Sequence, residues 1–112
     1  MRTSPLRVGG LSPIDACLWA EGPLERMRGL LGRDGLPRGT AMAFPHCRAV
    51  HTVGMRFALD VAFLDREGRL LRVARDVRPG RLLVWGGWRA RTVIEAEAGW
   101  LAPRRAQSTE YR

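Results

Sequence analysis

The spacing of apolar positions changes near residue 39, and this change predicts one early helix followed by strands. Three apolar residues within residues 22–32 recur at the spacing of one helix face: Leu24, Met27 and Leu31. Pro23 suits the first helical position, because a backbone N–H would have no helical partner there. Gly32 or Gly35 can end the helix in a left-handed conformation. Two or three turns cannot stand alone, so we expect this helix to pack on a sheet.

After about residue 39 the apolar segments become short, and turn residues separate them. The segments typical of strands are residues 40–44, 47–55, 59–64, 69–73, 82–85 and 90–98. The strongest local signal is the polar tetrapeptide 65–68, which ends in Gly68 between two apolar segments and fits a type I hairpin turn. Residues 16–20 are too few to distinguish helix from strand by period. Six short strands with one early helix predict a mainly β domain, either a strongly bent sheet or a small β-sandwich.

The length of the chain predicts one domain over residues 1–112. Residues 1–10 have no clear pattern and residues 103–112 are polar, so we expect both ends to be flexible. No apolar segment approaches the roughly 20 residues of a membrane helix, and the N-terminus lacks the apolar segment of a secretory signal. We therefore expect a cytoplasmic protein that does not bind membranes, with Cys17 and Cys47 as reduced thiols.

The formal net charge of +8 rests on arginine alone, since the chain has 19 basic residues and none of them is lysine. Arginine, glycine, alanine and proline have GC-rich codons, so we interpret this usage as a record of genome composition more than of selection for phosphate contacts. The arginines are also spread along the chain. We expect weak, salt-sensitive binding to polyanions and no specific nucleic-acid partner.

Five motifs follow one another in a characteristic order. They are Arg26-x-x-Gly29-Leu30-Leu31-Gly32-Arg33, a short strand with Met42 and Phe44, His51-Thr52-x-x-Met55, the segment 59–68 with Asp60 and Asp65, and Val93-Ile94-Glu95 before Ala98-Gly99. Together they resemble the uncharacterised prokaryotic family called domain of unknown function 192, over about residues 15–101. The resemblance implies a compact, mainly β, sandwich-like fold with a short helix, and a strand at residues 16–20. It implies no established activity, cofactor or substrate.

Cys47, His51 and Met55 form a C-x3-H-x3-M pattern whose soft donors would suit Cu(I). The valines and the threonine between them favour a strand. Residues four apart on a strand share a face but lie about 13 Å apart, whereas metal–ligand bonds measure about 2.0–2.3 Å. We therefore expect no metal site in this segment and no cofactor.

His51, Asp60 and Cys47 are the candidates for catalysis. A carboxylate can orient a histidine for acid–base chemistry, and a thiol beside a histidine resembles a nucleophile with its base. Asp60 follows Leu59 and precedes Val61, and a carboxylate in such an apolar segment must find donors or be protonated. We favour the simpler interpretation, in which Asp60 accepts backbone N–H groups in a tight turn or pairs with an arginine.

Four charged residues stand in apolar surroundings: Arg26, Arg33, Asp60 and Glu95. We predict that at least one of these acids pairs with one of these arginines and pins the helix to the sheet, because a planar guanidinium can bond a carboxylate twice. If the pairs are absent and the side chains surround an open cleft with His51, the enzyme interpretation gains weight. Arg26, Arg33, Met55 and Glu95 are also candidate binding residues.

Trp85, Trp88 and Trp100 are numerous for a chain of this length. Exposed tryptophans can stack on sugars or aromatic ligands, which makes Trp85 and Trp88 candidate binding residues. We favour the alternative in which the three rings pack over the open end of the sandwich.

Our first hypothesis is a non-enzymatic binding or accessory domain, a monomer or weak dimer, whose partner is a protein or a small-molecule ligand. The alternative is a small hydrolase-like enzyme that uses His51 and Asp60 with Cys47 or an arginine. A third hypothesis is non-specific polyanion binding by an arginine-rich surface. A cleft that joins His51, Asp60 and an arginine would favour the enzyme.

Overall fold

The computed structural model of the chain describes residues 1–101. Its elements are β1 (Arg2–Leu6), β2 (Ile14–Trp19), α1 (Pro23–Arg28), β3 (Thr40–Pro45), β4 (Ala49–Val50), β5 (Leu59–Leu64), β6 (Leu70–Val77), β7 (Val84–Trp85) and β8 (Thr92–Glu97). Six strands form one mixed sheet in the order β1-β2-β3-β8-β5-β6, and β4 pairs with β7 in a small second sheet. The predicted mainly β fold with one short helix is confirmed. Residues 103–112, expected to be flexible, lie outside the described residues.

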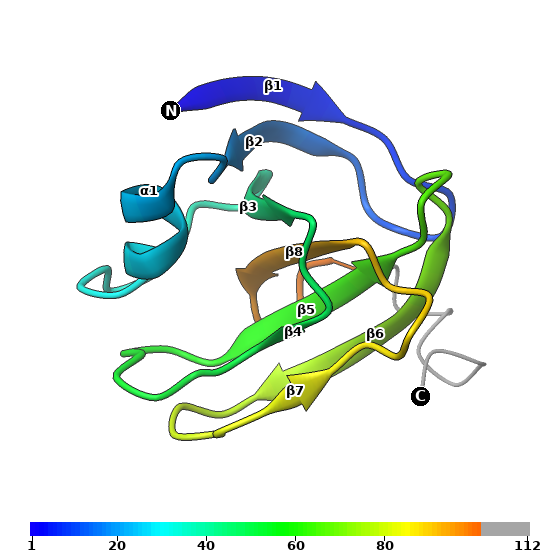
Figure 1. Cartoon of the computed structure of the whole chain (residues 1–112). Coiled ribbons are helices and arrows are strands. Elements are labelled where there is room, and N and C mark those ends of the chain that lie inside the picture. Colours follow the sequence, from blue (N-terminus) through cyan, green and yellow to red (C-terminus); the bar gives the residue numbers. More distant parts are fainter. Residues whose placement is uncertain (102–112) are drawn as a thin grey trace.

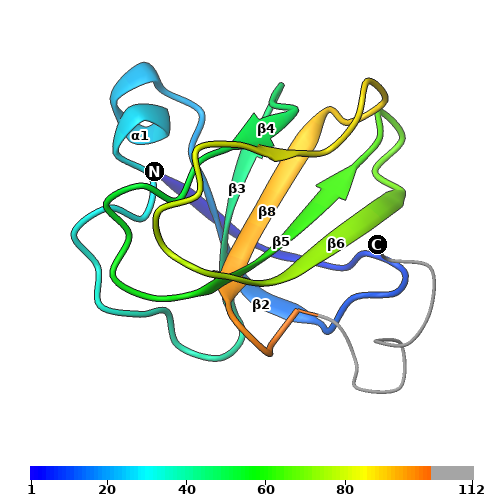
Figure 2. The ribbon, with the colours of Figure 1, turned by 90° about the horizontal axis from the view of Figure 1, so that it is seen from below.

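The large sheet curves strongly between its two edge strands, β1 and β6 (Figure 1). β2 and β3 run parallel, and α1 lies in the connection between them. The other neighbours in this sheet are antiparallel. Figure 2 shows α1 and β4 near the end of β3, so the connections that follow β2 and β3 meet at the same end of the molecule.

The three central strands, β3, β8 and β5, are buried on both faces. Their apolar residues therefore run continuously, without the alternation of a half-exposed strand. Ile94 of β8 packs in the core on one face of the sheet, and Val93 packs in the core on the other. Because side chains alternate along a strand, Glu95 points to the same face as Val93. An acidic residue thus stands at the centre of a buried strand.

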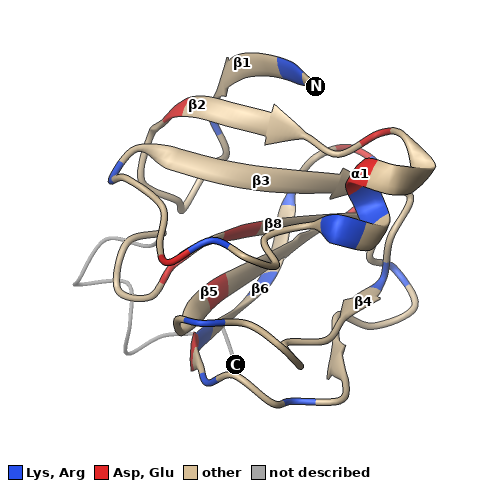
Figure 3. Ribbon diagram, turned by 90° about the vertical axis from the view of Figure 1, so that its left-hand side faces the viewer, with Lys and Arg blue, Asp and Glu red and all other residues tan. Residues whose placement is uncertain are grey.

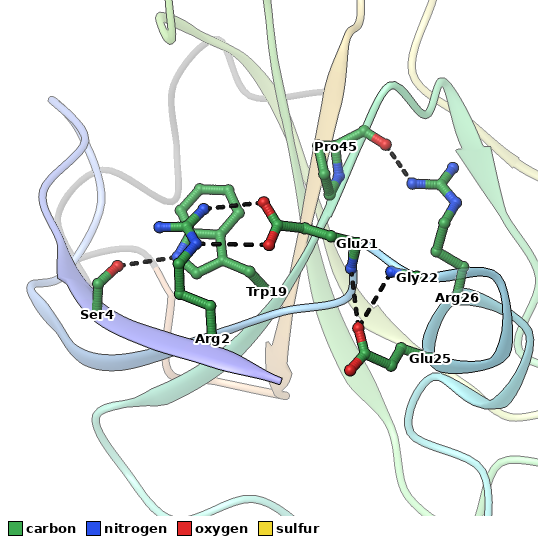
Figure 4. Close-up of polar contacts among 8 residues, drawn as sticks. All are labelled: Arg2, Ser4, Trp19, Glu21, Gly22, Glu25, Arg26 and Pro45. Carbon is green, nitrogen blue, oxygen red and sulfur yellow. Dashed lines mark hydrogen bonds and ion pairs between the residues drawn. The ribbon is translucent and has the colours of Figure 1, made fainter.

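The local strand predictions had mixed outcomes. The hairpin at residues 65–68 is confirmed, since β5 and β6 pair around it and Gly68 is left-handed with φ of 81°. The strand that the family resemblance implied at residues 16–20 is confirmed as part of β2. The prediction for residues 1–10 was wrong, because they contain β1, which pairs with β2. An indole hydrogen bond of 2.9 Å from Trp19 to the Ser4 hydroxyl fastens this edge (Figure 4).

The helix is shorter than its sequence pattern indicated, and none of its own residues is buried. α1 ends at Gly29, whose φ of 50° turns the chain out of the helix before Gly32 or Gly35 is reached. This turn directs Leu30 into the core, and Leu24 and Met27 remain 79% and 76% exposed. The prediction that the face with Leu24 and Met27 packs on the sheet was therefore wrong. No helix within residues 1–101 is long and apolar enough to cross a membrane.

The strand predicted over residues 47–55 was also wrong in extent, because only β4 is extended there. The chain then turns at Thr52, which is fully buried. Its hydroxyl donates to the Arg78 carbonyl at 2.7 Å and accepts the Arg81 N–H at 2.9 Å. Its backbone N–H also donates to the Arg81 carbonyl at 2.8 Å. Thr52 therefore joins the segment after β4 to the loop between β6 and β7.

The Thr52→Val variant is expected to lose about 2 kcal/mol of unfolding free energy in urea denaturation, because it leaves a buried carbonyl and N–H without partners. Valine keeps the shape of the side chain, so the loss measures the contribution of the hydroxyl group to the unfolding free energy. The Thr52→Ser variant keeps the hydroxyl and should lose less. An equal loss in both variants would instead assign the stabilisation to the methyl group.

Candidate functional site

A pocket of about 330 Å³ opens between α1 with its following turn and the segments of β3, β4 and β8. Its apolar walls include Met27, Leu30, Phe44, Val50 and Met55. Its polar lining consists of Arg26, Arg28, Cys47, His51 and Glu95. The pocket thus combines a mainly apolar wall with a few convergent polar groups, which is the usual composition of a ligand site.

Glu95 is the most deeply buried polar residue of this pocket, with 4% of its surface exposed. It sits at the middle of β8, paired with Met42 of β3 on one side and with Val61 of β5 on the other. Cross-strand partners point to the same face, so apolar side chains flank the carboxyl group. Within residues 1–101, its side chain takes part in no hydrogen bond and no ion pair.

Burial raises the pKa of Glu95 to about 8 from its ordinary value of 4.5, because the surrounding apolar groups disfavour the charged form. At neutral pH this side chain is therefore mostly a neutral carboxylic acid. A neutral carboxyl group can donate one hydrogen bond and accept others. Such a group facing a pocket can bind a polar group of a ligand or transfer a proton to it.

Arg26 positions α1 over the pocket. Its guanidinium donates to the Pro45 carbonyl (Figure 4) and, at 3.4 Å, to the His46 carbonyl, both at the end of β3. His46 has a left-handed φ of 57°, so the chain turns sharply there. At the other end of the helix, the Glu25 carboxylate accepts the N–H of Gly22 at 3.1 Å. Arg26 therefore holds the helix through backbone carbonyls, and its charge borders the pocket.

Cys47, His51 and Met55 all line this pocket, although we expected them to be spread along one strand. Because β4 spans only two residues, the chain bends around the pocket, and the 13 Å spacing assumed for a continuous strand does not apply. His51 is exposed and Met55 is half-buried. The Cys47 thiol donates to the Ala49 carbonyl at 3.0 Å. In the part of the chain that the structure describes, no three His, Cys, Asp or Glu residues lie close enough to hold a metal ion.

Asp60 lies outside this pocket, so the structure does not bring it together with His51. It is 2% exposed, and its carboxylate accepts three backbone N–H groups, from Asp76 at 3.0 Å, Gly99 at 2.9 Å and Leu101 at 3.3 Å. This arrangement agrees with the simpler interpretation of Asp60 as an acceptor of backbone N–H groups. Asp60 ties the C-terminal end of the described chain to β5 and β6.

The prediction that Asp60 or Glu95 pairs with Arg26 or Arg33 was wrong. None of the ion pairs within residues 1–101 joins these residues. Backbone groups satisfy Asp60 and Arg26, which leaves no need for a charged partner. Arg33 lines a neighbouring hollow on the other side of α1 and not the pocket with Glu95. Only Arg26 and Glu95 of the four thus face the same cavity as His51.

The tryptophans do not pack together over an end of the fold, as we had favoured. Trp100 packs against one core, whereas Trp88 is 78% exposed. The rings of Trp85 and Trp88 contact each other edge to face, with centroids 5.0 Å apart. Neither ring lines the pocket that contains Glu95.

Sequence reasoning identified most polar residues of the pocket, and Met55 among its apolar walls, but it missed Arg28 and the other apolar residues. Leu30 and Phe44 carry no chemical signal, and they meet only because Gly29 turns the chain toward β3. A side chain at Gly29 would approach the Phe44 ring to 3.3 Å. The left-handed glycine just after the helix is the one local feature that could have indicated this contact.

A model of the DUF192 family, described as "Uncharacterized ACR", matches residues 8–109. The chain belongs to the DUF192 family. The match covers nearly the whole chain, and it includes every residue of the pocket. No curated protein matches this DUF192 domain.

Two crystal structures share the fold of this DUF192 domain. A protein of unknown function from Novosphingobium aromaticivorans is 19% identical, with 88% of this chain and 83% of that chain covered and a TM-score of 0.69. A protein from Sinorhizobium meliloti, described as a "putative transcription regulator", is 21% identical, with 85% and 78% covered and a TM-score of 0.71. At these identities the likeness concerns the fold alone.

Proposed function

We propose that this DUF192 domain binds a small, mainly apolar ligand in the pocket between α1 and β8. A polar group of the ligand would form a hydrogen bond with the carboxyl group of Glu95. The observation that carries the proposal is a buried carboxyl group that faces a pocket and has no partner within residues 1–101. Buried polar groups are otherwise nearly always hydrogen-bonded. A ligand would supply the missing partner.

The pocket also constrains the chemistry of the ligand. Its volume of about 330 Å³ lies at the small end of the range for ligand sites. Arg26 and Arg28 border it, and the net charge of the chain is +8, so a free cation is repelled at long range. A neutral hydroxyl or amide group needs no ionised partner and fits the neutral carboxyl group of Glu95. We therefore propose an alcohol-like or amide-like group at that position.

A hydrolase-like enzyme is the second candidate, because a carboxyl group that titrates near neutral pH can act as a general acid. The arrangement of Cys47 weighs against it. A nucleophilic thiol requires a base within hydrogen-bond reach, but this thiol donates to the Ala49 carbonyl, and its neighbour His51 forms no hydrogen bond within the described residues. Binding without turnover is therefore the better-supported function.

Four probes with the same ring test the proposal: benzyl alcohol, benzamide, benzylamine and benzoate. At pH 6 the alcohol and the amide are expected to bind most strongly and to shift the backbone NMR signals of residues that line the pocket. The Glu95→Leu variant should bind the alcohol about fivefold more weakly, which corresponds to one neutral hydrogen bond. Binding of benzylamine should strengthen from pH 6 to pH 8, as Glu95 ionises and can form an ion pair.

The Glu95→Gln variant is the matched control, because glutamine keeps a neutral polar group of the same shape. It should bind the alcohol as the unaltered protein does, and it should lose the pH dependence for benzylamine. The proposal fails if no probe shifts signals of the pocket, or if the leucine variant binds all four probes as well as the unaltered protein.

A further inference from the structure

The segment around β7 exposes four large apolar side chains within seven residues. The exposed fractions are 84% for Leu82, 59% for Leu83, 38% for Trp85 and 78% for Trp88. We call these four residues the β7 surface. Single exposed apolar residues are ordinary, whereas such a concentration in one short segment suggests a surface for interaction.

The β7 surface is fixed to the domain. Val84 is buried in the core, and a side chain at Gly86 would collide with the Phe63 ring at 2.1 Å, so the backbone lies directly on that ring. The Trp85 carbonyl accepts a hydrogen bond of 2.5 Å from Arg72, and the Trp88 carbonyl accepts one of 3.0 Å from Arg48. Residues 84–88 are therefore anchored to the domain, and the side chains of Trp85 and Trp88 remain exposed.

The surroundings of the β7 surface are basic. Residues 77–94 contain four arginines and no acidic residue. Figure 3 shows basic positions on the ribbon below the label of β4, the strand with which β7 pairs. The Arg48 guanidinium lies 6.0 Å from the centre of the Trp88 ring, and Arg91 donates to the Trp88 carbonyl at 2.8 Å. Apolar side chains are thus bordered by positive charge, although the arginines looked evenly dispersed along the sequence.

We propose that the β7 surface docks on the surface of an anionic lipid bilayer. Leu82 and Leu83 would enter the boundary of the acyl chains, and the Trp88 ring would lie at the level of the headgroups, where tryptophan is enriched. The surrounding arginines would contact lipid phosphates. The sequence alone had predicted no membrane contact, because it contains no apolar segment of sufficient length, and a peripheral surface needs none.

The composition of the β7 surface favours a bilayer over other polyanions. Single-stranded nucleic acid binds to aromatic rings and basic grooves. Leu82 and Leu83 cannot stack on bases, and Leu82 is the most exposed residue of the β7 surface. A complementary protein surface would usually meet a mixture of charges, whereas the net charge of this segment is positive even though Asp76 pairs with Arg78 at its start. A uniformly anionic interface with an apolar interior matches both features.

Cosedimentation of the full chain with vesicles tests the proposal. Vesicles of phosphatidylcholine with about one-third phosphatidylglycerol should bind the protein and shift its tryptophan fluorescence to shorter wavelength, whereas pure phosphatidylcholine should bind it weakly. The L82S/L83S variant should bind at least tenfold more weakly. The R81Q/R89Q variant should bind roughly 25-fold more weakly, at about fivefold for each arginine.

Each variant has a matched control away from the β7 surface. Leu24→Ser removes an equally exposed leucine from α1 and should bind as the unaltered protein does. R7Q/R66Q removes the same charge from exposed positions and should weaken binding less than R81Q/R89Q does. Equal effects in test and control variants would overturn the proposal. It would also be overturned by binding to single-stranded RNA in place of vesicles, or by a dimer in solution that L82S/L83S dissociates.

Discussion

At pH 7 the Glu95→Gln variant is expected to unfold with a free energy about 3 kcal/mol larger than that of the unaltered protein. Burial raises the pKa of Glu95 from 4.5 to about 8, so the folded state holds a proton that the unfolded state has released. Each pKa unit corresponds to about 1.4 kcal/mol. Glutamine mimics the neutral carboxyl group and never has to bind that proton.

The direction of the pH dependence follows from the same shift. Below pH 4.5 both states hold the proton, and the contribution of Glu95 to stability is fully present. Between pH 4.5 and about 8 only the folded state holds it, so stability falls as the pH rises. Above about pH 8 the contribution is lost. Urea denaturation at several pH values should show this decline in the unaltered protein, and the glutamine variant should lack it.

Glu67→Gln provides the control for this measurement. It makes the same chemical change at an exposed position in the turn between β5 and β6, and the decline with pH should remain. A decline of unchanged slope in Glu95→Gln would contradict the prediction, because another group would then bind the proton.

The Asp60→Ala variant is expected to lose roughly 3–5 kcal/mol of unfolding free energy. This substitution of a buried acid is therefore destabilising, whereas Glu95→Gln is stabilising. Its carboxylate accepts three backbone N–H groups, and alanine leaves all three without an acceptor. Urea denaturation of the purified variant measures the loss. The loss should be large because two of the three donors, from Gly99 and Leu101, connect β5 to a segment about forty positions later in the chain.

Asp60→Asn separates charge from hydrogen bonding. Asparagine keeps one acceptor oxygen, so this variant should be more stable than Asp60→Ala and less stable than the unaltered protein. A loss below about 1 kcal/mol in Asp60→Ala would contradict the prediction. That result would mean that water replaces the carboxylate as the partner of these N–H groups.

Asp60 and Glu95 look alike in the sequence, since both are acidic residues within apolar segments. Their positions within the paired strands of the sheet distinguish them. Asp60 lies near the beginning of β5, where the β5–β6 register shifts around Asp76, a β6 residue with a φ of 50°. There Asp76 and the chain after β8 present free N–H groups. Glu95 lies in the middle of β8, where the ladder consumes the backbone donors on both sides. One acid is therefore satisfied within the fold, and the other faces a cavity.

The elements that could be predicted from the amino-acid sequence are those whose signals are local. The hairpin around Gly68 depends on four adjacent residues, and the family motifs identified the strand at residues 16–20. The candidate list also contained most polar residues of the pocket, because charged and sulfur-containing side chains in apolar segments are visible without coordinates.

Which of these residues meet depends on the three-dimensional packing of the chain. The backbone turn at Gly29 placed Leu30, which follows α1, in the core and left Leu24 and Met27 of α1 in solvent. The shortness of β4 brought Cys47, His51 and Met55 to one cavity, contrary to their spacing on an ideal strand. Periodicity describes one element at a time, whereas a pocket forms where several elements end together, and the positions of those ends depend on long-range packing.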